Sequence, residues 1–464
     1  MTSDERRGRI VLAVCALLLG MAVVRVAIHD PGDAPLNGDQ SNFVYNAVSL
    51  RGGNLSYDEE DQARWEALGW TTNPSGIFFQ ARDDGWAFAK PIGYSVLLTP
   101  ALALFGLQGV SVVGAALVLA YAGCWYAACR LRWERPVSAL VATAATIASH
   151  AWFYGFPAHA DLFVAVLVGI VANGCLRAVR PGHGRWVLVA AAAAGLLATE
   201  KVPALLALLP LLAVTATRTS RRTALVGIAV LVAVGAVSTL PYLYYSDGAS
   251  WSPYGGDRYY ALGSPPWAGG DPGSFSRMET DEVISASYAW QRATHPTAEI
   301  GSAAVSYVIG QRTGALTFLP VVPALVLATL VARPWRRRTG ATSDEPDAGI
   351  DRGLALSAVL GLAAYAAFYV VLFTDNHYGG LQSIGSRYFL QLSPLAVVVP
   401  VAGGLRARMA VGCAAFAALW AVLVLGPNLW HAETAFADPS RVSWVQGLLP
   451  LDGSQVGYWQ REGG

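Results

Sequence analysis

The chain has 464 residues, of which 54% are hydrophobic and only 14% are charged. Soluble domains usually carry about 25% charged residues, so this composition excludes a soluble enzyme and indicates a polytopic membrane protein. The formal net charge of +1 excludes the strongly basic balance of nucleic-acid-binding proteins, and no nucleic-acid partner is expected.

Apolar runs predict an all-α fold with about eleven transmembrane helices. The first run, near 10–27, follows three arginines and lacks a clear cleavage site, so we interpret it as a retained signal anchor with a cytoplasmic N-terminus. The later spans are predicted near 108–129, 136–156, 160–178, 186–198, 202–217, 223–245, 312–332, 354–374, 388–405 and 409–427.

The distribution of charge predicts the orientation in the cell membrane. More than half of the 32 basic residues fall at the N-terminus and in turns on one side, which the positive-inside rule assigns to the cytoplasm. Most of the 31 acidic residues fall on the other side, in two large outer loops, about 30–107 and 246–311, and in the tail. We therefore expect one multi-pass domain, 1–427, and a short extracytoplasmic tail, 428–464.

The apolar run from Pro91 to Phe105 is too short to cross about 30 Å of hydrocarbon. If this run crossed the membrane, every later basic turn would lie outside. We therefore predict an interfacial or re-entrant helix on the outer face.

Several common catalytic and binding motifs are absent from the sequence. The five cysteines lie in or beside apolar runs and predict neither a disulfide nor a zinc site. The chain contains no phosphate-binding Gly-Lys-Ser/Thr loop, no GxGxxG, no HExxH and no GxSxG. The sequence therefore argues against a nucleotide-driven pump and against a membrane hydrolase with a standard motif.

Ionisable residues at the outer membrane surface are the candidate site, because such residues are costly near lipid. Asp39 follows the first span and is either a general base or the N-cap of a surface helix. Lys90 and Arg387 either bind a phosphate or extend to ordinary lipid headgroups. Glu200 and Lys201, between two apolar runs, either pair with each other or belong to the site.

The chain carries an early acidic motif, a Lys-Pro motif, a second acidic residue and a late Arg-Tyr. The residues of these motifs are Asp39, Tyr45, Gly52-Gly53, Lys90-Pro91-Ile92-Gly93-Tyr94, Leu104-Phe105-Gly106, Asp161 and Gly385-Ser386-Arg387-Tyr388-Phe389. In their order and predicted side, these motifs resemble the GT-C fold glycosyltransferases, in particular the protein O-mannosyltransferase and lipid A aminoarabinose transferase type, and the resemblance covers roughly 10–405.

This resemblance implies transfer of a sugar, with inversion, from a polyprenyl-phosphate carrier to an extracytoplasmic glycan, glycolipid or protein. Asp39 would be the general base and Asp161 a second catalytic carboxylate. Fixed cations would stabilise the departing phosphate. The residues expected at that phosphate are Lys90, Lys201, Arg387 and Tyr388, and those expected to bind substrate are Tyr45, Tyr94, His159 and Glu200.

The sequence departs from the family pattern in two places. Asp39-Gln40 replaces the usual Asp-Glu, and Lys90-Pro91-Ile92 replaces Lys-Pro-Pro. The missing Glu weakens the case for a metal, so no metal ligands are assigned and a divalent metal stays an open alternative.

The second outer loop is rich in aromatic residues. Their rings either stack on a sugar or acceptor, or pack this loop onto the first outer loop or the membrane interface. They are Trp251, Tyr254, Tyr259, Tyr260, Trp267, Tyr288 and Trp290.

Two other functions remain open from the sequence. A transporter or flippase of lipid-linked sugars would agree with the number of spans and with the interrupted helices near residues 199–203, although the large outer loops argue against it. A noncatalytic subunit of an envelope complex would tolerate loss of Asp39, Lys90 and Arg387 together.

Overall fold

A computed structural model describes residues 3–33, 36, 38–70, 74, 76–82, 85–245, 258–271, 275–278, 294, 298–332, 351–374, 385–426, 443 and 445–450. The predicted tail, 428–464, therefore lies largely outside the described residues, as do parts of the loop 246–311.

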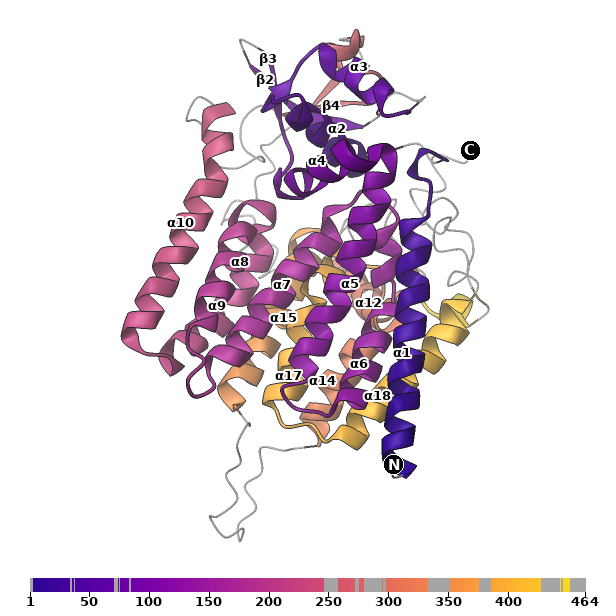
Figure 1. The fold of residues 1–464 in the computed structure, drawn as a ribbon, viewed down its shortest axis with the longest axis vertical. Coiled ribbons are helices and arrows are strands. Elements are labelled where there is room, and N and C mark those ends of the chain that lie inside the picture. The colour runs from indigo at the N-terminus through magenta and orange to yellow at the C-terminus, as the bar shows by residue number, and fades with distance from the viewer. Residues whose placement is uncertain are drawn as a thin grey trace.

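Most of the described chain is helical, and its longest helices form a bundle with the N-terminus at one end (Figure 1). The bundle helices are α1 (Ser3–Ala27), α5 (Gly109–Cys129), α6 (Arg135–Ile147), α7 (Ala160–Ala178), α8 (Trp186–Glu200), α9 (Val202–Arg218), α10 (Arg221–Tyr245), α14 (Val321–Val331), α15 (Arg352–Leu372) and α18 (Ala407–Val424). Shorter helices are α12 (Ala298–Ile309), α13 (Ala315–Phe318), α16 (Arg387–Leu392) and α17 (Val398–Ala402).

Six helical stretches within the described residues are long and apolar enough to cross a membrane. They are Ser3–Ala27, Gly93–Cys129, Ala160–Ala178, Arg221–Tyr244, Arg352–Leu372 and Ala407–Val424. The prediction of a mostly helical membrane protein is confirmed at this level, while the number eleven and the orientation stay predictions. The segment predicted at 388–405 is divided into α16, a 3-10 turn (Ser393–Val397) and α17, with Pro394 at the division.

Large apolar side chains are exposed along α1 and α10. Leu17 and Met21 are exposed on α1, as are Leu225 and Val237 on α10. Faces of this kind are unfavourable in water and are expected against lipid.

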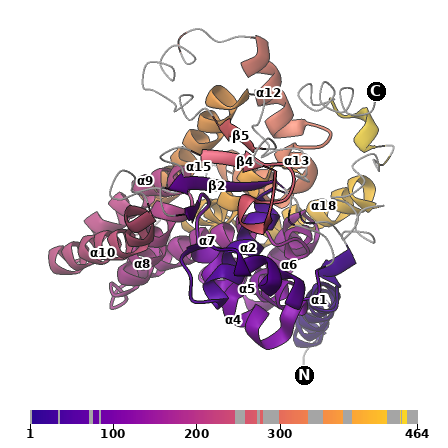
Figure 2. The same ribbon diagram turned by 90° about the horizontal axis from the view of Figure 1, so that it is seen from above.

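A five-stranded antiparallel sheet covers the end of the bundle opposite the N-terminus (Figures 1 and 2). This sheet is an addition to the predicted helical fold. The sequence did not reveal it, because strands of two to six residues are too short to show a clear alternating pattern. In the order β1-β3-β2-β4-β5, the strands are β1 (Ser56–Tyr57), β3 (Gly85–Phe88), β2 (Ile77–Arg82), β4 (Arg258–Ala261) and β5 (Phe275–Met278).

Pairing of β2 with β4 joins the two predicted outer loops into one unit. Trp267 packs inside this unit, with its ring stacked on Tyr57 at 4.2 Å and edge-on to Phe79 at 5.5 Å. Tyr259 also stacks on Phe79. For these two aromatic residues the packing alternative is supported, whereas four of the predicted aromatics lie outside the described residues: Trp251, Tyr254, Tyr288 and Trp290.

Two further helices, α2 (Asp39–Arg51) and α4 (Gly93–Phe105), lie between the sheet and the bundle, and α3 (Glu60–Ala67) lies beside the sheet (Figure 1). α4 packs against α2 with one face, and its other face exposes apolar side chains such as Leu97 and Leu104. Gly106, at φ 58°, ends α4 before α5 begins. The sequence predicted a separate short helix over the run from Pro91 to Phe105, and α4 matches that run. The exposed apolar face of α4 fits an interfacial position.

Two glycines of α5 give a matched test of how closely α5 packs against the 3-10 helix Ala151–Gly155. An added Cβ at Gly114 would overlap the carbonyl oxygen of Gly155, whereas one at Gly123 would meet open space. We expect Gly114→Ala to lower the thermal unfolding midpoint in detergent and Gly123→Ala to leave it unchanged or raise it, because alanine is the better helix former. Equal midpoints for the two variants would contradict the close approach of α5 to the 3-10 helix Ala151–Gly155.

Candidate functional site

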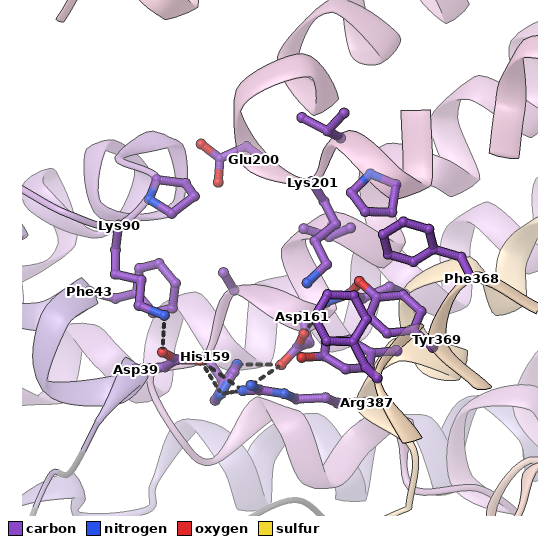
Figure 3. Close-up of a pocket in the computed structure, with 18 residues that line it drawn as sticks. Asp39, Phe43, Lys90, His159, Asp161, Glu200, Lys201, Phe368, Tyr369 and Arg387 are labelled. Atoms are coloured by element: carbon purple, nitrogen blue, oxygen red, sulfur yellow. Dashed lines mark hydrogen bonds and ion pairs between the residues drawn. The ribbon is translucent and has the colours of Figure 1, made fainter. Parts of the chain in front are cut away.

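A cavity of about 320 Å³ lies where the sheet-covered layer meets the bundle (Figure 3). It brings together seven ionisable residues from separate segments: Asp39, Lys90, His159, Asp161, Glu200, Lys201 and Arg387. Tyr388, the remaining residue expected at a carrier phosphate, lines the same cavity.

Most of these residues lie at helix ends. Asp39 begins α2, Asp161 is in the first turn of α7, and Arg387 begins α16. Glu200 ends α8, and Lys201 separates α8 from α9. Several bundle helices therefore stop at one level and direct their terminal polar groups into the same space.

The start of α2 is fixed by Gly38 and Asn42. Gly38 has φ 60° and directs the chain into the helix. The amide of Asn42 donates to the carbonyl of Gly38 at 3.0 Å, and its oxygen accepts from the backbone N–H of Phe78 at 3.1 Å. Because Phe78 lies in β2, the sheet holds Asp39 in place.

Asp39 forms two ion pairs at once. Its Oδ1 atom lies 2.6 Å from Nζ of Lys90, and its Oδ2 atom lies 2.9 Å from Nη1 of Arg387. Burial alone would raise the pKa of Asp39, but the charges of Lys90 and Arg387 outweigh that effect and hold the pKa well below its usual range. The carboxylate is therefore ionised at neutral pH.

Arg387 is held by the residues before it. Gly385 has φ 64° and donates its N–H to the carbonyl of Arg312 at 3.0 Å. The hydroxyl of Ser386 accepts from the N–H of Phe389 and caps α16. A cation at a helix N-terminus is unfavourable to the helix dipole, so the neighbouring carboxylates of Asp39 and Asp161 compensate for it.

His159 and Asp161 form a second polar chain. Nδ1 of His159 faces Oδ2 of Asp161, whose other oxygen accepts from Gln391. The oxygen of Gln391 accepts from the hydroxyl of Tyr365. Arg387 lies 2.7 Å from Nε2 of His159, and a guanidinium only donates, so the neutral imidazole carries its proton on Nδ1.

Lys201 is a cation without an ion pair in the described part of the chain. Its Nζ atom lies 4.4 Å from the ring centroid of Tyr388, which stacks on Tyr369 at 3.9 Å. Lys201 and Glu200 do not pair. Oε1 of Glu200 instead accepts from the N–H of Gly93 at 2.7 Å.

Two of the expected substrate-binding residues lie away from the cavity. Tyr45 is buried among aromatic residues, with its ring 5.3 Å from Trp65 and 5.8 Å from Trp267. Tyr94 is buried against Phe43. The structure thus gives both tyrosines packing positions behind the site.

Sequence reasoning missed Gln391 and Tyr369, which line the cavity. The sequence gives no signal for these two residues, but the use of lysine does point to the cavity itself. Only two of the 32 basic residues of the chain are lysines, Lys90 and Lys201, and both line this cavity. A rare residue type concentrated in one pocket indicates a requirement for a compact amine, because arginine serves at every other basic position.

No group of three or more His, Cys, Asp and Glu side chains suited to a metal ion occurs among the described residues. We therefore derive no step through a metal.

Comparisons of the chain with protein-family models, with curated proteins and with solved structures found no match.

The low pKa of Asp39 predicts a specific pH dependence of stability. Asp39→Asn leaves Lys90 and Arg387 less compensated, and we expect a loss of about 3 kcal/mol at neutral pH. Because the folded-state pKa is depressed, this contribution is present above the ordinary aspartate pKa and is lost as the pH falls through the folded value. The thermal unfolding midpoints of wild type and Asp39→Asn should therefore differ from pH 7 down to about pH 4 and converge below about pH 4. Convergence of the two midpoints already near pH 6 would contradict the lowered pKa of Asp39.

Proposed function

We propose that this protein is a membrane glycosyltransferase that moves a sugar from a polyprenyl-phosphate carrier to an acceptor outside the membrane. The observation that carries the proposal is the meeting of Asp39 with three cations, Lys90, Lys201 and Arg387, in one cavity beneath a sheet-covered layer. The proposal also includes eleven spans, a cytoplasmic N-terminus and an extracytoplasmic site.

Transfer of a sugar requires a base and a stabilised leaving group. An acceptor hydroxyl attacks the anomeric carbon and gives its proton to Asp39, while the bond from that carbon to the phosphate oxygen breaks. The electron pair of that bond stays on the departing phosphate. Asp39 is ionised in this site, which is the protonation state that a general base requires.

The departing phosphate gains negative charge, and Lys201 is the cation best placed to receive it. Lys90 and Arg387 are already paired with Asp39, whereas Lys201 makes no ion pair among the described residues. The wall beside Lys201 is apolar and suits the first units of an isoprenoid chain; it includes Val202, Pro203, Phe368 and Phe373.

Donor turnover tests this function directly. Purified protein in nanodiscs would receive a panel of polyprenyl-phosphate sugars and an envelope extract, with release of polyprenyl phosphate as the readout. We expect wild type to release the carrier, and Asp39→Asn to lower kcat/KM by about 10²- to 10⁴-fold, the usual contribution of a general base.

Asp351→Asn is the matched control. Asp351 accepts from the N–H of Leu354 and caps α15 at the end remote from the cavity, where asparagine caps equally well. This variant should retain activity within about twofold. Movement of labelled carrier across a liposome bilayer without a new glycosidic bond would instead establish a transporter.

Lys201→Gln tests the assigned phosphate contact. A hydrogen bond to a charged group contributes about 1.5–3 kcal/mol, so the donor KM should rise about ten- to hundredfold. Steady-state kinetics over a range of donor concentrations measure this change. An unchanged donor KM would remove Lys201 from the phosphate site.

A further inference from the structure

The break between α8 and α9 places two consecutive ionisable residues in different roles. Figure 3 shows Lys201 pointing toward Asp161 and Tyr369, while Glu200 points away from them. Lys201 has φ −161° and ψ 82°, which interrupts the helical path and separates the two side chains. Glu200 therefore serves another part of the site.

Glu200 holds the start of α4. Its side chain is buried, and Oε1 accepts from the N–H of Gly93 at 2.7 Å. An added Cβ at Gly93 would overlap this carboxylate, so a larger residue there would displace the Glu200 side chain from its present position. The next N–H toward the N-terminus, that of Ile92, donates to the hydroxyl of Tyr242 at 2.8 Å. Side chains of α8 and α10 thus satisfy two backbone groups that the helix itself leaves unpaired.

The start of α4 is linked to Lys90 by a short, stiff segment. Pro91 has a restricted φ and also restricts the backbone of the residue before it. Lys90 lies three residues before Gly93, and its amine lies 2.6 Å from Asp39. A displacement of the first turn of α4 would therefore be transmitted to the amine that pairs with Asp39.

We infer that Glu200 is a positioning residue, which fixes the start of α4 and thereby sets the position of Lys90 against Asp39. The sequence predicted a substrate contact for Glu200, which stays a prediction: Oε1 is engaged by α4, while Oε2 has no hydrogen-bond partner among the described residues. The consequence for catalysis rests on the proposed function, whereas the geometry is measurable without any substrate.

The two-lysine composition makes the test direct. An amine-acylating reagent modifies only Lys90, Lys201 and the N-terminal amine of the chain. The rate of Lys90 acylation, measured by mass spectrometry in nanodiscs with the N-terminal amine as internal reference, reports how firmly Lys90 is held against Asp39. Thermal unfolding of each variant confirms that it folds.

We expect Glu200→Leu and Gly93→Ala each to raise the rate of Lys90 acylation about tenfold or more, the equivalent of one lost hydrogen bond to a charged group. Glu200→Gln should keep the wild-type rate, because its amide oxygen still accepts from Gly93. In Glu200→Ala, adding Gly93→Ala should cause no further change, since the overlap has gone.

Tyr242→Phe should raise the rate in the same direction and supplies a second measurement if Glu200→Leu does not fold. A wild-type rate of Lys90 acylation in folded Glu200→Leu and Gly93→Ala would overturn the inference. Because this readout uses no donor, loss of glycosyl transfer alone would bear on the proposed function and leave the positional inference intact.

Discussion

The ion pairs of Asp39 with Lys90 and Arg387 are the interaction on which the site depends. Asp39 and Arg387 are 348 residues apart in the sequence, so this contact joins the sheet-covered layer to the late helices of the bundle. Charges buried beside apolar helices are costly unless each finds an opposite charge. This requirement explains why α2, α7 and α16 all begin at the same level. α2 and α7 contribute the carboxylates of Asp39 and Asp161, and α16 contributes the guanidinium of Arg387 that lies between them, so none of these charges is buried alone.

The charged residues of the site are positioned in two different ways. Asp39 and Arg387 are set by backbone geometry, through the positive φ of Gly38 before α2 and of Gly385 before the Ser386 cap of α16. Lys201 makes no ion pair within the described part of the chain and lies instead against the stacked rings of Tyr369 and Tyr388. A cation against an aromatic face is attracted without being neutralised. Its charge therefore remains available to an incoming anion, which is the property that a phosphate site requires.

The sequence allowed the helical regions and most charged residues of the cavity to be predicted. Ionisable side chains between apolar runs are conspicuous, which is why Asp39, Lys90, Asp161 and Arg387 were found. The sheet was missed because its pairing joins strands of two to six residues that lie far apart in the chain. Tyr45 was placed in the site by resemblance, but helical spacing alone does not show which face of a helix meets the cavity and which meets the aromatic core. Whether the cavity acts on lipid-linked sugars stays a prediction.

The pairing of β2 with β4 also constrains the order of biosynthesis. Ile77 pairs with Ala261, and the helices α4–α10 lie between these strands in the chain. The first half of the sheet therefore emerges long before its partner and must wait, with an open strand edge, until those helices have been made. During this interval a chaperone or a neighbouring membrane protein would have access to the edge of β2. Assembly of the sheet-covered layer is consequently a late event, completed only after most of the bundle exists.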